Sequence, residues 1–303
     1  MVTPSPAPGV KYRLNDVSLL RRPGPTQRVR VREVAARTVR DREDRLATEE
    51  PLEIRLAWPG RPAERLSVTM RTPGHDFELA AGFLAGEGIV VGSSDLHTVA
   101  YCTDHALAPE EEFNVVTVEL SRPPRRIPSV RYDGPGAAVS ACGVCGKQSI
   151  EEVMAVGTRT GLGDRWRDLT IPADVLVSLP GTLRAAQKVF RTTGGLHAAG
   201  LFEADGTSVA VREDIGRHNA VDKVVGSRLL SDSPSDLPVL CVSGRIGFEL
   251  VQKAVTAGVG VIAAVGAPST LAVTLAAQAG LCAVGFLRDE RFVIYSVPER
   301  IGV

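Results

Sequence analysis

The sequence predicts an α/β protein with two units, a small N-terminal α/β roll followed by a larger three-layer unit. In the first unit, two strand-like runs, one helical run and two further strand-like runs follow one another between residues 50 and 120. In the second unit, apolar β-branched runs alternate with amphipathic segments, a pattern typical of parallel strands covered by helices on both faces. The chain of 303 residues is 44% hydrophobic, which is enough to form two cores.

The first unit is predicted to span residues 29–135, after a mobile tail at residues 1–28 that is rich in Pro, Arg and Gly. LEIRLAW and RLSVTMRT alternate apolar and polar residues on either side of a PGRP turn, which predicts a hairpin. DFELAAGFLAGEG has helical spacing with Gly86 as its stop, and HTVAYC and FNVVTVEL are strand-like. We therefore expect a ββαββ unit whose helix covers one face of a four-stranded sheet.

The second unit is predicted to span residues 136–303 and begins at the end of a connection rich in Pro, Arg and Gly. TIPADVLVSL and GTLRAAQKVF are predicted as two helices broken at Pro180, and LHAAGLFEADGTSVAVRED as a hairpin about Asp205 and Gly206. Strand and helix then alternate through LPVLCVSG, GFELVQKAVTAG, VGVIAAVGA, STLAVTLAAQAG and LCAVGFL, with FVIYSV as a last edge strand. In such sheets ligands bind beyond the carboxyl ends of the strands, here at the turns around Ser243, Gly266 and Leu287.

Composition excludes several classes of function. The 35 basic and 35 acidic residues cancel, so no overall field draws the chain to nucleic acid or to an anionic membrane. No stretch has the roughly eighteen apolar residues of a membrane span, and the amino terminus has no signal-peptide pattern. An odd number of cysteines, five, favours a reducing compartment. We expect a cytoplasmic protein.

The segment ACGVCGKQSIEEV places Cys142 and Cys145 in a CxxC pair, which suits a metal site, a redox pair or a sulfur-handling nucleophile. A structural zinc site needs four ligands, and only one such pair exists, although His197 and His218 could complete a site. Zinc deaminases carry H-x-E upstream of P-C-x-x-C; here Ala141 replaces the proline and no H-x-E precedes the pair. Cys102, Cys241 and Cys282 lie singly in apolar runs and are expected to be buried.

The residues after the CxxC pair favour a mobile thiol. Ser149 and Glu152 form a capping-box pattern, so the next helix is expected to begin near Ile150, beyond both cysteines. A glycine-rich thiol arm outside the helix, with Lys147 nearby to stabilise a thiolate, suits a group carrier that meets first a donor and then an acceptor.

Four further stretches place Gly, Ser, Thr or a basic residue at turns before helices, where free N–H groups and the helix dipole bind phosphate. They are TTGGLHAAG, REDIGRHNAVDKVVG, SGRIGFELVQKA and GAPSTLAV. The residues predicted to contact a bound anion there are His197, Arg217, Ser243 and Arg245. The residues predicted to add positive charge around this side of the sheet are Arg217, His218, Lys223, Arg245, Lys253, Arg288 and Arg291.

In combination these motifs resemble the FdhD family of formate dehydrogenase accessory sulfurtransferases. The resemblance runs from about residue 30 to the end and is carried by EPLEIRL, HDFELAAGFLAGEGIV, CGVCGK, GLHAAGLF, REDIGRHNAVDKVVG, SGRIGFELVQKA, GAPSTLAV and GFLRDERFVIYS. It implies a cytoplasmic sulfur carrier that takes sulfur as a cysteine persulfide from a cysteine desulfurase of the IscS type. The carrier would pass it to the bis-molybdopterin guanine dinucleotide form of the molybdenum cofactor before that cofactor enters formate dehydrogenase.

The resemblance also implies site residues and a fold. Cys142 would carry the persulfide, with Cys145 auxiliary, and no permanent metal is expected. The stretch matching the family's cofactor-binding segment is Phe286, Leu287, Arg288, Asp289, Glu290 and Arg291. The second unit would have a cytidine-deaminase-like fold, and a homodimer is compatible with the family. Two alternatives stay open: a zinc-dependent deaminase-like hydrolase that uses both cysteines and a histidine, and a non-catalytic chaperone that only binds the cofactor.

Overall fold

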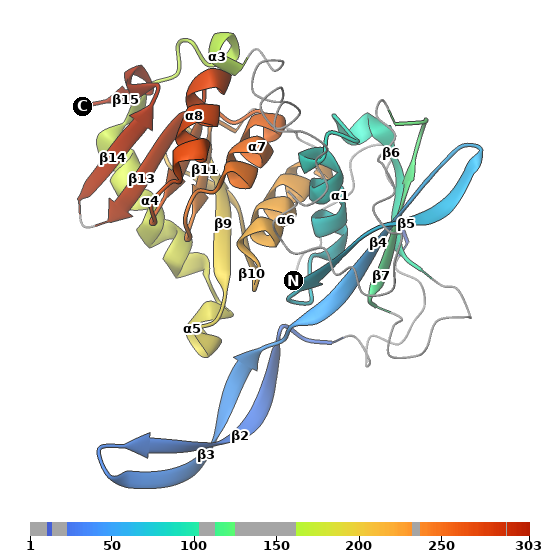
Figure 1. The fold of residues 1–303 in the computed structure, drawn as a ribbon, viewed down its shortest axis with the longest axis vertical. Coiled ribbons are helices and arrows are strands. Elements are labelled where there is room, and N and C mark those ends of the chain that lie inside the picture. Colours follow the sequence, from blue (N-terminus) through green and yellow to red (C-terminus); the bar gives the residue numbers. More distant parts are fainter. Residues whose placement is uncertain (1–10, 14–22, 103–112, 125–161, 232–236, 289) are drawn as a thin grey trace.

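The computed structural model describes residues 11–13, 23–102, 113–124, 162–231, 237–288 and 290–303. Two sheets lie on either side of a layer of helices (Figure 1). The CxxC pair, Ser149, Glu152 and Asp289 lie outside the described residues. Within the described residues, no helix is long and apolar enough to cross a membrane.

The N-terminal sheet confirms the predicted ββαββ unit and adds one strand. Its order is β1-β6-β7-β4-β5, formed by β1 (Lys11–Arg13), β4 (Glu50–Trp58), β5 (Arg61–Arg71), β6 (Leu96–Tyr101) and β7 (Val115–Leu120). Helix α1 (Asp76–Gly86) packs on one face of this sheet, and the short helix η1 (Ser93–Asp95) precedes β6. Nine of the eleven residues of α1 are buried, because a second layer of helices covers its other side.

The C-terminal sheet has six strands in the order β10-β9-β11-β12-β13-β14. The strands are β9 (His197–Phe202), β10 (Ser208–Asp214), β11 (Val239–Val242), β12 (Val261–Ala264), β13 (Cys282–Arg288) and β14 (Arg291–Ser296). β11, β12 and β13 are parallel, whereas β9, β10 and β14 run antiparallel to their neighbours. The predicted hairpin about Gly206, the alternation of strands and helices and the edge position of β14 are confirmed.

Side chains that alternate along these strands fill two cores, which gives the unit its three layers. Leu240, Val242 and Ile262 face α6 (Arg217–Leu229), α7 (Phe248–Ala257) and α8 (Thr270–Ala279). Val239 and Cys241 face the other side, where α4 (Ala173–Ala186) packs. The remaining short elements are α3 (Leu162–Arg165), β8 (Ile171–Pro172), α5 (Phe190–Thr193), η3 (Pro298–Arg300) and β15 (Ile301–Gly302), with β15 paired to β8.

The prediction of two helices broken at Pro180 was wrong, since α4 continues through this residue. Pro180 lacks an N–H and normally interrupts a helix at a cost of about 3 kcal/mol. The buried side chains Leu176, Leu179 and Leu183 form one stripe that spans the proline on a single helix face. Burial of this continuous stripe against the sheet outweighs the local cost, so the helix stays unbroken.

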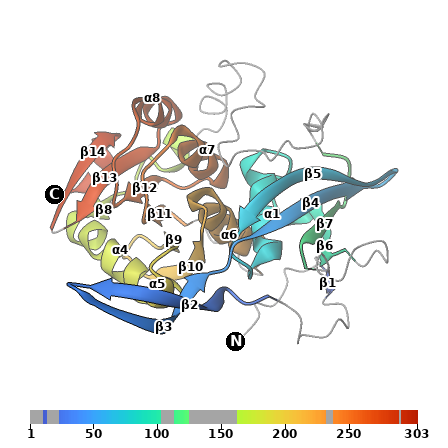
Figure 2. The same cartoon turned by 60° about the horizontal axis from the view of Figure 1, so that its bottom comes forward.

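Two parts of the predicted tail at residues 1–28 belong to strands instead. Residues 11–13 form β1, parallel to β6, and residues 26–28 begin β2 (Thr26–Ala35). β2 pairs with β3 (Thr38–Ala47) in a long antiparallel hairpin that projects from the body and whose β3 strand lies beside α5 (Figure 2). No strand was predicted for this segment, because its sequence is rich in charged residues and has few apolar ones.

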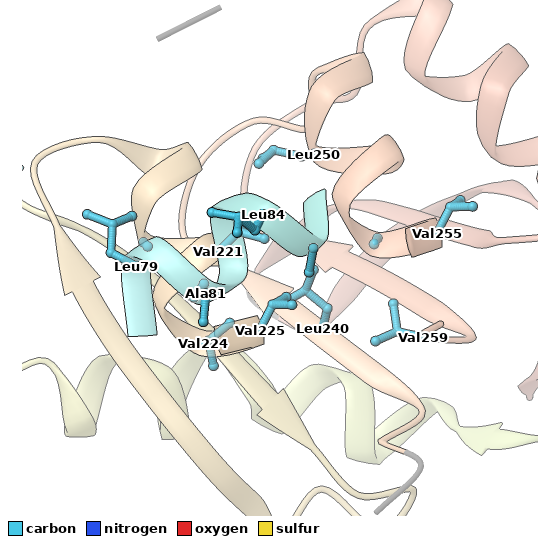
Figure 3. Close-up of a cluster of buried hydrophobic side chains, with 14 of the residues drawn as sticks. Leu79, Ala81, Leu84, Val221, Val224, Val225, Leu240, Leu250, Val255 and Val259 are labelled. Carbon is cyan, nitrogen blue, oxygen red and sulfur yellow. The ribbon is translucent and has the colours of Figure 1, made fainter. Parts of the chain in front are cut away.

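The two units share one hydrophobic core. Leu79, Ala81 and Leu84 of α1 lie against Val221 and Val224 of α6, and the cluster continues to α7 and β11 (Figure 3). The helices α1 and α6 cross where both carry glycine: a Cβ atom at Gly82 would lie 1.8 Å from the Asp222 carbonyl oxygen, and one at Gly226 would lie 1.8 Å from the Glu78 carbonyl oxygen. The C-terminal helices are therefore held directly on the N-terminal unit.

A buried carboxylate also joins the units. Glu78 of α1 accepts a 2.7 Å hydrogen bond from Arg212 Nη2 of β10 and lies 3.0 Å from His75 Nδ1. Burial alone would raise the pKa of Glu78, but the bonds from Arg212 and His75 outweigh it and lower the pKa below the usual value of 4.5.

The lowered pKa of Glu78 predicts a loss of stability in acid. Because the folded state favours the ionised form, the stabilisation is complete above the unfolded pKa of about 4.5 and is lost as the pH falls through the folded value. Urea unfolding at pH 7 is expected to show Glu78→Gln less stable than wild type by about 2 kcal/mol. That difference should shrink steadily below pH 4.5, and a difference that stays constant down to pH 3 would contradict the assignment.

Candidate functional site

The parallel strands β11, β12 and β13 end at one side of the C-terminal sheet, which we call the carboxyl edge. The turn residues at their ends are bonded to one another: Gly266 N donates to the Gly244 carbonyl oxygen (3.1 Å), and Phe286 N donates to the Gly266 carbonyl oxygen (3.1 Å). A Cβ atom at Gly266 would lie 2.8 Å from the same Gly244 oxygen, so only glycine allows this close approach. The three turns thus form one connected surface, as the sequence predicted.

The antiparallel strands bring further predicted residues to this edge. His197 begins β9 opposite Asp214, which ends β10, and α6 starts three residues later at Arg217. A Cβ atom at Gly244 would lie 3.5 Å from His197 Nδ1 and 3.8 Å from Arg217 Cδ, so these groups are neighbours. Ser243 is also present, and its Oγ accepts a 2.9 Å hydrogen bond from Ala198 N.

Two helix N-termini at the carboxyl edge have no side-chain cap. The N-cap residues of α6 and α7 are Gly216 and Gly247, and neither supplies a side-chain hydrogen bond. By contrast, Ser269 caps α8 by accepting a bond from Ala272 N. Uncapped N–H groups and the positive dipole ends of α6 and α7 favour an anion at this edge.

Two buried nitrogen atoms also favour an anion at this edge. Within the described residues, Arg217 Nε and His218 Nε2 are inaccessible to solvent and have no hydrogen-bond partner. His218 Nε2 lies 3.8 Å from Glu249 Oε2, a distance longer than a hydrogen bond. A bound group with acceptor oxygens would satisfy these atoms, as the chemistry of buried polar groups requires.

The titration of the neighbouring groups reflects the positive field. Burial, together with the charges of Arg217 and His218, lowers the pKa of His197 from 6.5, so His197 is neutral at pH 7. Burial alone would raise the pKa of Glu249, but the neighbouring His218, a backbone amide and Arg217 lower it, so Glu249 is ionised. Glu249 is not among the residues predicted for this edge, although an acidic residue in the first turn of a helix beside a predicted anion site is a usable signal.

The predicted segment 286–291 forms the end of β13 and the turn to β14. Phe286 is half-buried and has a left-handed φ of 53°, at a bulge where the register between the two strands shifts. Arg288, Glu290 and Arg291 are exposed, and Arg288 pairs with Arg291 across the hairpin. Leu287 is fully buried in the core beneath α4, because the bulge turns its side chain inward, so it does not face a ligand.

Of three residues predicted to add positive charge at the carboxyl edge, one is exposed there and two are buried in ion pairs. Arg245 is exposed at the carboxyl edge, as predicted. Lys223 and Lys253 are buried, where Lys223 Nζ lies 2.7 Å from Asp214 Oδ2 and Lys253 Nζ lies 2.6 Å from Asp222 Oδ1. Their charges are used inside the protein and are not free to bind an anion.

The cysteines that the structure describes are unsuited to carry sulfur. Burial raises the pKa of Cys241 and of Cys282 to about 12, so both stay protonated. Cys102 is half-buried and accepts a hydrogen bond from Arg55 Nη1 (3.7 Å). Across the described ranges, no three His, Cys, Asp or Glu side chains are grouped to hold a metal ion.

Comparison with known proteins gives a consistent result. Residues 47–302 match the model of the FdhD/NarQ family. The chain is 52% identical over 262 residues to the sulfur carrier protein FdhD of Nocardia farcinica, covering 86% of this chain and 89% of that protein. It is 47% identical over 279 residues to the sulfur carrier protein FdhD of Streptomyces coelicolor, covering 92% and 96%.

A solved structure has the same fold. The crystal structure of a proposed formate dehydrogenase accessory protein from Desulfotalea psychrophila superposes with a TM-score of 0.67 at 22% identity and covers 91% of this chain and 99% of that one. The motifs, the family match and the relatives agree over most of the sequence, and the chain belongs to the FdhD/NarQ family.

Proposed function

We propose that this protein is a cytoplasmic sulfur carrier that serves formate dehydrogenase. Relatives that match about nine-tenths of the chain bear the name sulfur carrier protein, and the CxxC motif at Cys142 and Cys145 supplies a suitable thiol. Burial raises the pKa of Cys241 and of Cys282 and so keeps both thiols protonated, which leaves the CxxC pair as the stronger candidate for a reactive thiolate.

In the proposed first step, the Cys142 thiolate attacks the outer sulfur of a persulfide on a cysteine desulfurase. The donor's S–S bond breaks, the donor cysteine leaves as a thiolate, and Cys142 becomes a persulfide with no net change in oxidation state. Delivery of the outer sulfur as sulfide needs two electrons. A thiol, either Cys145 or a small thiol in solution, supplies them by forming a disulfide.

The proposed acceptor is the molybdenum cofactor in its bis-guanine dinucleotide form, bound at the carboxyl edge. The observation that carries this assignment is the pair of buried donors without partners, Arg217 Nε and His218 Nε2, beside two uncapped helix starts. His197, Ser243, Arg245 and the exposed residues of segment 286–291 surround the same edge. Phosphate oxygens of a nucleotide fit such donors, and the exposed Arg288 and Arg291 suit a diphosphate.

Mass spectrometry tests the sulfur step. After incubation with a cysteine desulfurase and cysteine, the intact protein is expected to gain the mass of one sulfur atom, and a reducing thiol should remove it. Cys142→Ala should abolish the gain because the nucleophile is lost, whereas Cys102→Ala should keep it. A wild-type protein that gains no sulfur, or a Cys142→Ala protein that still gains it, would refute the carrier role.

The two alternatives make different predictions. A cofactor-binding chaperone predicts that Cys142→Ala restores formate dehydrogenase activity to a strain lacking the protein, whereas the carrier predicts no activity. A zinc hydrolase that uses Cys142 and Cys145 predicts one equivalent of zinc in the purified protein, and its loss in the same variant.

A further inference from the structure

A cluster of polar side chains is buried behind the carboxyl edge, between the two units. It consists of Thr72, Asp214, Asn219 and Lys223, and we call it the polar lock. Lys223 Nζ donates to the Thr72 carbonyl oxygen (2.8 Å) and to the Glu213 carbonyl oxygen (3.3 Å), and it lies 2.7 Å from Asp214 Oδ2. The side chains of Lys223 and Asp214 are 1% and 0% exposed.

The carboxylate of Asp214 accepts hydrogen bonds at both oxygens. Oδ2 accepts from Thr72 N (3.1 Å), and Oδ1 accepts from Gly216 N (2.9 Å) and from Asn219 Nδ2 (3.1 Å). The three protons of Lys223 match its three acceptors, so the pair is fully satisfied. Such a network permits only one arrangement of the backbone groups that it binds.

Those backbone groups belong to two segments that are distant in sequence. Thr72 directly follows β5 of the N-terminal sheet, and Gly216 is the N-cap of α6. Two more bonds join the same segments: Ile215 N donates to Thr72 Oγ1 (3.2 Å), and Asn219 Nδ2 donates to the Met70 carbonyl oxygen (2.7 Å). The next residues along the chain are Arg217 and His218, which carry the buried donors without partners.

We propose that Asp214 and Lys223 are positioning residues for the nucleotide site, an inference that rests on the site proposed above. They fix the turn from β10 to α6 against the N-terminal unit and so set the place of Arg217, His218 and the first N–H groups of α6. The nucleotide site is then a product of both units, although its contacting residues come from the second.

The geometry favours positioning over mere stabilisation. A buried ion pair gains little net stability over an apolar pair of similar size, because desolvation of both charges offsets their attraction. What the pair adds here is a directional hydrogen bond, which Asp214 Oδ1 accepts from the N–H of Gly216, the N-cap of α6. Removal of both charges together should therefore change the stability little, whereas loss of the bond to Gly216 N should weaken nucleotide binding.

The test measures binding of guanosine diphosphate to the full chain by calorimetry, at a temperature at which circular dichroism shows every variant folded. In Asp214→Asn/Lys223→Met the ion pair is lost, but the amide oxygen can still accept from Gly216 N. In Asp214→Ala/Lys223→Met that acceptor is lost too. We expect Kd to rise about tenfold in the alanine variant and less than about threefold in the asparagine variant, as for side chains that orient a ligand-binding group.

A second buried ion pair, which joins α6 to α7, provides the control. Asp222 and Lys253 are also buried, between α6 and α7, but neither bonds to the β10–α6 turn. Asp222→Asn/Lys253→Met should keep wild-type affinity even if it lowers thermal stability. The inference fails if the alanine variant binds like wild type, or if affinity follows thermal stability across all three variants. A wild-type protein that does not bind the probe would refute the proposed nucleotide site itself, whatever the result at Cys142.

Discussion

Gly226→Val is expected to destabilise the protein by about 3 kcal/mol or more, the upper range for overpacking a closely fitted core. At Gly226 the first side-chain carbon would lie 1.8 Å from the Glu78 carbonyl oxygen, and Gly82 meets Asp222 in the same way from the other helix. Backbone rather than flexible side chains opposes the new atoms, so α1 and α6 must move apart. That movement would open the core shared by the two units, and urea unfolding followed by circular dichroism measures the cost.

The control for this prediction is Gly181→Ala in α4, where no atom lies within 4 Å of the added carbon. This change should be neutral or should stabilise the protein by up to about 1 kcal/mol, because alanine favours a helix over glycine. If Gly226→Val proves as harmless as Gly181→Ala, the two helices do not cross at these glycines and the shared core is packed differently.

Much of the fold was predictable because its signals are local. Apolar runs such as VLCV and VIAA, separated by helical segments that end in glycine, specify strands and helices within short windows. The carboxyl edge followed from the rule that ligands bind where parallel strands end. The rule brought His197, Arg217, Ser243 and Arg245 to one place, and the structure agrees.

The errors arose where distant residues decide the outcome. Pro180 predicts a break, but the stripe of leucines on either side of it is buried against the sheet, and that burial is a tertiary effect. Lys223 and Lys253 were predicted to add positive charge at the ligand side of the sheet. In the structure both lysines are buried, because they form ion pairs with Asp214 and Asp222. The spacing of residues in the sequence does not show which carboxylates pair with them.

The orientation of the Leu287 side chain was also not predictable from its motif. Alternation along β13 would place Leu287 and Gly285 on one face and Phe286 on the other. The bulge between Gly285 and Arg288 changes that register, and the side chain of Leu287 enters the core. A motif therefore located the segment but did not show which of its side chains face a ligand.

Arg71→Met is expected to destabilise the protein by about 3–5 kcal/mol, because a buried charge loses its partner. Arg71 is 0% exposed, and its guanidinium donates to Asp76 Oδ1 (3.1 Å), Glu50 Oε2 (3.3 Å) and the Phe113 carbonyl oxygen (3.0 Å). It thereby joins β4, β5 and the start of α1 to the residues before β7. Methionine fills much of the space but satisfies none of these acceptors.

Two comparisons make the Arg71 prediction specific. Arg61→Met removes an exposed pair with Glu64 on the same strand and should change stability by less than about 0.5 kcal/mol. Arg71→Met/Asp76→Asn removes both buried charges and should recover a large part of the loss, since Tyr101 can still hydrogen-bond to the amide. Equal losses in the two single arginine variants would show that Arg71 is not a structural charge.

Because Thr72, the next residue, bonds to Asp214 and Lys223, a destabilised Arg71 variant should also bind guanosine diphosphate more weakly, which joins this prediction to the polar lock.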